Sequence, residues 1–278
     1  MKGERIAFPA INVGVITMAR TENGKVALIT GGGQGIGQAV AERLHADGFK
    51  VAIADLNFET ASKVAEKLGG KNGGAIALHV NVSDRDSVFG AVDQAVAELG
   101  GFDVIINNAG IAPQSPLDEI TVESIEKVFS INFNGVVWGI QAATKAFKAL
   151  GHGGKIISAA SQAGHEGNPG IALYSATKFA IRGLSQSAAR DLAKYGITVN
   201  TFAPGIVKTP LMEELALKTA ALAGKPDEWG WEQFTQGIAL ERLAEASEVA
   251  GVVSFLSGPD SNYITGQSIL VDGGMVFN

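Results

Sequence analysis

Thr30-Gly-Gly-Gly-Gln-Gly-Ile-Gly37 is the stretch that decides the fold of this chain. It continues Val26-Ala-Leu-Ile-Thr30, a short apolar run typical of a parallel strand buried on both faces. From Gly35 the apolar residues recur at helical spacing. Gly31, Gly35 and Gly37 allow a tight turn, a close backbone approach to a pyrophosphate and close packing of helix on strand. A diphosphate would bind the free N–H groups at the positive end of this helix, whereas a plain glycine-rich turn is the alternative.

A carboxylate follows the next apolar run. Asp55 comes directly after Val51–Ala54, 18 residues beyond Gly37. A carboxylate at this place accepts hydrogen bonds from an adenosine ribose and repels a 2′-phosphate. Gln34 in the loop and Leu56-Asn57 after the carboxylate supply no cation for such a phosphate. The pattern favours NAD over NADP, with a helix-capping or turn role as the alternative for Asp55.

Strand-like and helix-like segments alternate from residue 25 to the end of the chain. The expected strands are 26–30, 51–54, 75–80, 103–106, 155–158, 197–202 and 268–271, and the expected helices are 35–47, 59–68, 84–99, 124–130, 132–150, 174–194, 211–222 and 247–256. Short right-handed crossovers then predict one α/β domain over residues 24–278, a Rossmann-type, doubly wound parallel sheet with helices on both faces. Residues 1–23 are expected to form a loose N-terminal extension.

Composition narrows the function classes. The 278 residues carry a formal net charge of −6 and no long basic run, which argues against nucleic acid and membrane partners. No apolar run approaches the ~20 residues of a membrane span. Cysteine is absent, which fits a cytoplasmic location. The four histidines show no metal-ligand spacing, so we expect no metal, and His165 is expected to be a hydrogen-bonding loop residue.

Tyr174-Ser-Ala-Thr-Lys178 places a phenol and an ammonium group four residues apart, on one face of a helix. Ser161 lies 13 residues upstream, just after an expected strand, at the sheet edge where such folds bind ligands. Asn132 opens the helix before that strand. Each residue alone has an ordinary explanation: a half-buried tyrosine, a solvated lysine, a turn serine and a helix cap. The joint occurrence of all four, in this order and spacing, predicts a catalytic site with Asn132, Ser161, Tyr174 and Lys178.

The chemistry explains these residue types. Oxidation of an alcohol removes the hydroxyl proton while a hydride leaves carbon, and a free phenol with a pKa near 10 is a poor base at neutral pH. We expect the Lys178 ammonium, aided by oxidised nicotinamide, to lower the pKa of Tyr174. Tyr174 then serves as the base in oxidation and as the acid in reduction. Ser161 would hold the reacting oxygen in position.

These motifs resemble the short-chain dehydrogenase/reductase family. The matching segments are Thr30–Gly37, Asn107-Asn-Ala-Gly110, Asn132, Ser161, Tyr174/Lys178 and Pro204-Gly-Ile-Val-Lys-Thr209, in the family's order. More narrowly, Ser161-Gln-Ala-Gly-His-Glu-Gly-Asn-Pro169 and Val271-Asp-Gly-Gly-Met-Val-Phe-Asn278 resemble its acetoin reductase/2,3-butanediol dehydrogenase branch. The cofactor-binding residues that the resemblance and the motifs imply are Gly31, Gln34, Gly35, Ile36, Gly37, Asp55, Asn81, Val82, Asn108, Ala109, Gly110, Tyr174, Lys178, Pro204, Gly205, Val207 and Thr209.

The resemblance implies further roles. Lys178 would also bind the nicotinamide ribose, and Asn132 would hold a water that links the site to solvent. Asn81 stands where the family often has an aspartate on the adenine amino group, so weaker adenine recognition is expected. The family further implies a homo-oligomer, a tetramer, with the helix 174–194 and the C-terminal segment as interfaces.

Around the expected substrate, Gln162 and Asn168 are polar groups that would bind a second oxygen, beside Ser161, Tyr174 and Gly205. Asn168 is alternatively a turn residue before Pro169. Residues 211–235 are expected to form a lid that excludes water, with a plain surface helix as the alternative.

The resulting hypothesis is an NAD(H)-dependent oxidoreductase for a small vicinal hydroxyketone or diketone and its alcohol, acetoin (diacetyl) and 2,3-butanediol first. The alternatives are a sugar alcohol, hydroxysteroid or 3-ketoacyl substrate, or a dinucleotide-sensing protein without turnover.

Overall fold

A computed structural model of the chain describes residues 24–277, except for some side chains of helix α7 (Pro210–Ala223). The expected N-terminal extension, residues 1–23, lies outside the described residues. Seven parallel strands form one sheet in the order β3-β2-β1-β4-β5-β6-β9. The strands are β1 Val26–Thr30, β2 Lys50–Asp55, β3 Ala75–His79, β4 Val104–Asn107, β5 Lys155–Ala159, β6 Thr198–Pro204 and β9 Ser268–Val271. The expected α/β fold is confirmed.

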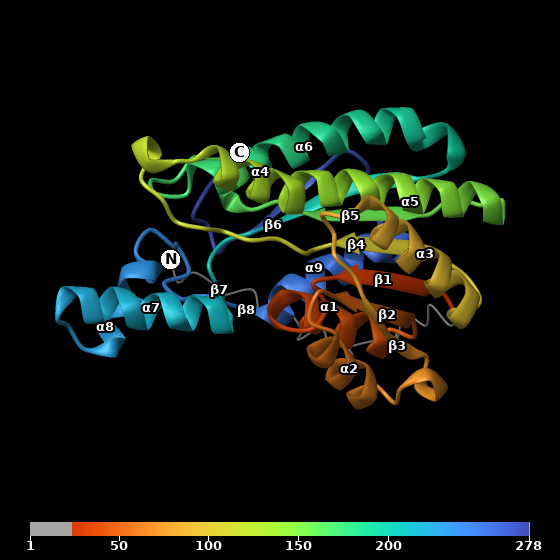
Figure 1. Cartoon of the computed structure of the whole chain (residues 1–278), viewed down its shortest axis with the longest axis horizontal. Helices are drawn as coiled ribbons and strands as arrows, with labels where there is room; N and C mark the ends of the chain where they lie inside the picture. The colour runs from red at the N-terminus through yellow and green to blue at the C-terminus, as the bar shows by residue number, and fades with distance from the viewer. Residues whose placement is uncertain (1–23, 278) are drawn as a thin grey trace, which may run out of the picture.

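Helices cover both faces of the sheet (Figure 1). One apolar core joins the sheet to α3 (Arg85–Leu99), α5 (Gly135–Leu150) and α6 (Ala172–Leu192). The other joins it to α1 (Gly35–Ala46) and α2 (Phe58–Lys67), with α9 (Ala246–Ser257). Strands β1, β2, β4, β5 and β6 are buried over almost their whole length, because helices pack on both sides of them.

Strand order reverses between β1 and β4, since the chain builds β1 to β3 outward on one side and β4 to β9 on the other. At such a switch point the loops after the strands diverge and leave a crevice at the carboxyl edge. The glycine-rich loop after β1 and the segment after β4 both lie at this edge. This edge is therefore where a ligand site is expected.

Two regions differ from the expected elements. The helix expected over 132–150 begins at Gly135, because Ser130–Asn134 forms a π-helical turn that joins it to α4 (Val122–Phe129). The region after β6 is also more elaborate. It contains α7, a second helix α8 (Asp227–Thr235), and the short parallel strands β7 (Val207–Lys208) and β8 (Ala244–Glu245).

Helices α7 and α8 pack on each other and stand out from the main body (Figure 1). Across residues 24–277, no helix combines the length and the apolar character needed to cross a membrane.

Candidate active site

The glycine-rich loop has glycine where the chain turns sharply and where it lies against the backbone of neighbouring residues. Gly31 and Gly35 have φ angles of +62° and +56°, a region that favours glycine. A Cβ on Gly31 would lie 2.9 Å from Ala109 Cα, and one on Gly37 would overlap the carbonyl oxygen of Gly31. Gln34 precedes α1 without a side-chain cap, and the first turn of α1 has no acidic residue. The N–H groups of this turn therefore form a cradle suited to an anion.

Asp55 ends β2 and faces this loop. Its Oδ2 accepts a hydrogen bond from the Gly33 N–H at 2.9 Å, and its Oδ1 accepts one from the Asn57 N–H at 2.9 Å. The carboxylate thus fixes the loop against the start of α2, where Asn57 is the N-cap. The turn role considered from sequence is present, and the half-buried carboxylate also keeps free acceptor capacity beside the loop.

The segment after β4 closes the other side of the loop. The Asn108 side chain donates to the carbonyl oxygens of Thr30 and Gly31, both at 3.1 Å. The Thr30 hydroxyl accepts from the N–H groups of Asn108 and Ala109, at 3.0 and 3.2 Å. Thr30 is a structural residue of the site that sequence reasoning did not assign, since nothing local marks a contact between residues so far apart in the chain.

Four expected cofactor residues have their side chains engaged elsewhere. Ile36 and Val207 pack into the core that contains α1 and α9. The Asn81 side-chain Oδ1 accepts from both the N–H and the hydroxyl of Ser83, at 3.1 and 2.7 Å. Val82 packs against Gly135, whose Cβ would lie 3.1 Å from the Cβ of Val82. The buried Val207 can thus offer only backbone groups to a ligand in the crevice.

Tyr174, Ser161 and Lys178 come together at the carboxyl edge of β5. Tyr174 and Lys178 occupy one face of α6, and Ser161 begins the turn after β5. The Tyr174 phenol is hydrogen-bonded to Ser161. The Lys178 Nζ lies 5.3 Å from the centre of the Tyr174 ring and donates to the Ala159 carbonyl oxygen at 2.7 Å. The three expected residues are therefore brought together.

Burial controls the protonation of this cluster. It lowers the pKa of Lys178 to about 8, from an ordinary value of 10.5. Burial raises the pKa of the Tyr174 phenol, and the hydrogen bond with Ser161 opposes that rise. The lowered phenol pKa expected from sequence does not arise from the protein groups described. A neutral phenol is the form that donates a proton.

Asn132 lies in the π-helical turn, not at the start of a helix as expected. Its side chain is fully buried, accepts from the Ile111 N–H and donates to the Ile111 carbonyl oxygen, both at 2.8 Å. It also donates to the Thr177 hydroxyl at 3.2 Å. A Cβ on Gly110 would lie 3.2 Å from the Asn132 Oδ1 and 3.7 Å from the Lys178 Nζ. The extra residue of a π turn thus aims Asn132 at the loop after β4.

The residues expected at the substrate lie in the turn and loop after Ser161. Gln162 is buried, and Asn168 has a buried Nδ2 without a hydrogen-bond partner among residues 24–277. The His165 Nε2 is hydrogen-bonded to the Ser268 hydroxyl at 2.9 Å, which confirms its loop role. Gly205 follows β6, and a Cβ there would lie 2.8 Å from Asp272 Cα. An unsatisfied buried amide is a donor available to a ligand.

The expected lid is anchored beside the glycine-rich loop. Thr209 caps α7 by accepting from the Met212 N–H at 3.4 Å, and its Cγ2 would lie 3.5 Å from a Cβ on Gly35. A cavity of about 350 Å³ opens next to it, lined by Lys208, Thr209, Glu213 and Trp231. The start of the expected lid therefore borders both the loop and an open space.

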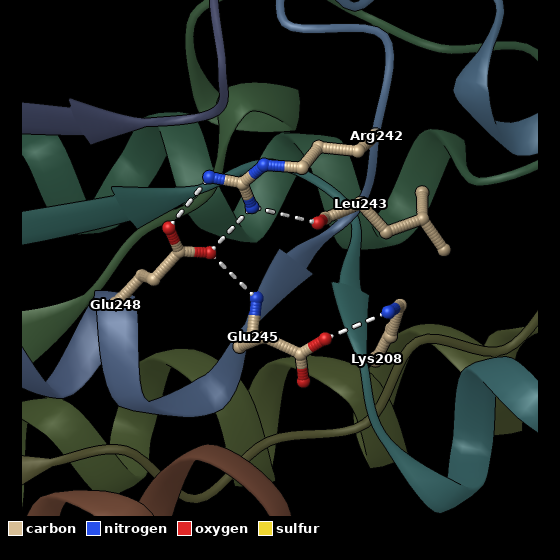
Figure 2. A network of polar contacts seen from close by, with 5 residues as sticks. All are labelled: Lys208, Arg242, Leu243, Glu245 and Glu248. Carbon is tan, nitrogen blue, oxygen red and sulfur yellow. Dashed lines mark hydrogen bonds and ion pairs between the residues drawn. The ribbon is translucent and has the colours of Figure 1, made fainter.

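A network of charges joins the two ends of the lid region (Figure 2). Arg242 donates to both carboxylate oxygens of Glu248, at 2.8 and 2.7 Å. Lys208 on β7 pairs with Glu245 on β8 at 2.7 Å, and the Glu245 N–H donates to Glu248. The Arg242 guanidinium lowers the pKa of Glu248 to about 2. The network spans the two connections of the expected lid, which the pairing of β7 with β8 holds side by side.

Within the described range, no three histidine, aspartate or glutamate side chains gather in a way that could hold a metal ion.

The profile of the short chain dehydrogenase family matches residues 25–220. A diacetyl reductase [(S)-acetoin forming] of Staphylococcus aureus (strain Mu50 / ATCC 700699) is 60% identical over 255 residues, which covers 92% of this chain and 99% of the relative. The L-2,3-butanediol dehydrogenase of Corynebacterium glutamicum is 46% identical over 91% of this chain and 99% of its own.

Proposed function

This chain belongs to the short chain dehydrogenase family, and we propose on that premise that it uses NAD(H) to interconvert diacetyl, acetoin and 2,3-butanediol. The observation that carries the proposal is the cluster of Tyr174, Ser161 and Lys178, found in a chain so similar to a diacetyl reductase. A protein that only senses a dinucleotide has no need of a hydrogen-bonded phenol and serine beside a buried ammonium group.

The site fits a nicotinamide dinucleotide. Gly31, Gly35 and Gly37 let the loop pack closely against its neighbours, and the free N–H groups at the start of α1 form a cradle that suits a diphosphate. We propose NAD over NADP because Asp55 holds a carboxylate at the ribose end of this cradle, where a 2′-phosphate would be repelled. When bound, the cofactor supplies or accepts the hydride.

Proton transfer is proposed for Tyr174. In reduction, its neutral phenol donates a proton to the carbonyl oxygen as that oxygen gains negative charge. Lys178, whose Nζ lies 5.3 Å from the centre of the Tyr174 ring, stabilises the resulting phenolate, and Ser161 donates a hydrogen bond to the same substrate oxygen. In oxidation the proton moves in the opposite direction. Asn132, through Ile111 and Thr177, is proposed to support the proton path behind Lys178.

Preference for a vicinal substrate is proposed for Gln162 and Asn168. The unpartnered Asn168 Nδ2 is a donor, so it suits the second carbonyl of diacetyl or the second oxygen of acetoin. Gln162 is buried next to Ser161 and can bind the same oxygen. A ketone with a single oxygen cannot satisfy these groups. Helices α7 and α8 are proposed to act as the lid over this pocket.

We further propose a homo-oligomer, a tetramer, of a cytoplasmic enzyme. Phe179 on α6 and Phe277 near the C-terminus are 44% and 82% exposed in the single chain, which supports the two interfaces expected from sequence.

NADH consumption with a panel of carbonyl compounds tests the function. Diacetyl and acetoin should be reduced with a higher kcat/KM than keto sugars, steroids and 3-ketoacyl thioesters, and NADH should be used better than NADPH. If a steroid, keto sugar or thioester were the preferred substrate, the proposal of diacetyl and acetoin as substrates would be wrong. NADPH as the preferred cofactor would overturn the role of Asp55.

A further inference from the structure

Helix α6 contacts the end of β5 and the turn after it through three residues, each four positions apart. Tyr174 is hydrogen-bonded to Ser161, and Lys178 Nζ donates to the Ala159 carbonyl oxygen at 2.7 Å. One turn further, the Arg182 Nη1 donates to the Gly164 carbonyl oxygen at 2.6 Å. Residues at this spacing share one face of a helix. Arg182 is thus the third member of a row whose first two members form the proposed site.

Packing and hydrogen bonds both set the position of this turn, and the Ala163 side chain within it is fully buried. The Ser161 hydroxyl accepts from the Ala163 N–H at 3.1 Å within the turn itself. Gly164 presses directly on α6, because a Cβ there would lie 2.8 Å from the Lys178 backbone. On the far side, His165 is hydrogen-bonded to Ser268. Loss of the Arg182 contact would loosen the end of the turn at Gly164 and allow a small shift of Ser161, which begins the same turn.

The Arg182 side chain is half-buried and held by a charge-assisted hydrogen bond. Its guanidinium lies 5.9 Å from the centre of the Phe179 ring. Its Nε is buried without a hydrogen-bond partner within residues 24–277. A buried donor without an acceptor is unfavourable for stability, so this arginine is not explained by stability alone. The hydrogen bond of Arg182 to Gly164, which fixes the geometry of the turn, offers a reason for its presence.

We infer that Arg182 is a positioning residue that holds the Ser161 turn against α6 and so fixes the serine hydroxyl relative to the Tyr174 phenol. The inference rests on the roles proposed above for Ser161 and Tyr174. Arg182 itself touches neither of the two residues in the contacts described, and it acts through Gly164.

The test compares Arg182→Ala with Arg190→Ala, an exposed arginine on the same helix. Arg182→Ala should lower kcat for diacetyl reduction by about tenfold to a hundredfold, since displacement of a reacting group by about 1 Å has that effect. KM for diacetyl, the Kd of NADH by fluorescence titration, and Tm should stay close to wild type. Guanidinium chloride at low millimolar concentration should restore part of the lost kcat, whereas potassium chloride should not. Arg190→Ala should behave as wild type.

A kcat of Arg182→Ala within twofold of wild type would overturn the inference. So would a loss of kcat that guanidinium does not restore and that falls in step with Tm and NADH affinity, because it would show a merely structural role. If Arg182→Ala does not fold, Arg182→Met decides, because it keeps most of the length of the side chain and removes the donor to Gly164. A lower kcat at wild-type Tm supports the inference, and wild-type kcat overturns it. Tyr174→Phe is measured in parallel, because activity in that variant would refute the proposed site itself.

Discussion

Replacing Lys178 by methionine should make the folded protein more stable, although the residue is proposed to act in the reaction. Lys178 is 3% exposed, and burial lowers its pKa from 10.5 to about 8. At about 1.4 kcal/mol per pKa unit, the buried charge lowers the free energy of unfolding by about 3 kcal/mol. The variant also loses the hydrogen bond to the Ala159 carbonyl oxygen, worth about 1 kcal/mol. The net gain is therefore about 2 kcal/mol.

The sign of the pH dependence follows from the direction of the shift. The folded state releases the Lys178 proton at a lower pH than the unfolded chain does, so wild-type stability rises with pH between about 8 and 10.5. The methionine variant lacks this contribution. The difference in free energy of unfolding between the two proteins should be largest below pH 8. It should shrink as the pH rises from about 8 to 10.5.

Thermal unfolding of the protein without cofactor measures this gap. Below pH 8, Lys178→Met should unfold about 4–8 °C above wild type, at 2–4 °C per kcal/mol for a chain of this size. Lys127→Met, which removes an exposed lysine on α4, should leave Tm within about 1 °C of wild type. A variant less stable than wild type below pH 8, or a gap that does not change with pH, would refute the reasoning. Diacetyl reduction by Lys178→Met should fall at least tenfold, because the phenolate loses its cation.

Three further substitutions test other parts of the site. Tyr174→Phe should lower kcat at least a hundredfold with nearly unchanged NADH affinity, because only the proton-transfer oxygen is lost; more than a few per cent of residual activity would remove Tyr174 from its role. Asp55→Ser should raise KM for NADH and improve the relative use of NADPH, and an unchanged NADPH/NADH ratio of kcat/KM would argue against ribose recognition there. Glu248→Gln should raise KM for diacetyl about threefold with little change in Tm, because exposed ion pairs contribute little to stability; an unchanged KM would separate the charge network from the lid.

Much of the fold follows from patterns that are local in the sequence. The glycine spacing after Val26–Thr30, Asp55 after the second strand, and Tyr174 four residues before Lys178 predict both the sheet and the edge where these groups meet. Parallel strands bring their carboxyl ends to one side, so Ser161 and Tyr174 come together although separate elements carry them.

Features that depend on distant contacts were not predicted. The π-helical turn at Asn132 is stabilised by bonds to Ile111 and Thr177, which no local periodicity indicates. Helix α8 and the pairing of β7 with β8 were missed, since a two-residue strand is too short to show alternation. Arg182 resembles any polar helix residue in sequence, and only the fold places it at Gly164.

Recognition of the second substrate oxygen is the most direct test of the account. The measurement is kcat/KM for acetoin relative to 2-butanone, with NADH, in wild type and in Gln162→Ala. Each neutral hydrogen bond to that oxygen is worth about 0.5–1.5 kcal/mol, so wild type should prefer acetoin by several-fold to about tenfold per contact. Gln162→Ala should narrow the preference mainly by reducing kcat/KM for acetoin. Equal kcat/KM for the two ketones in wild type, or equal losses on both in the variant, would contradict the proposed recognition of a vicinal oxygen.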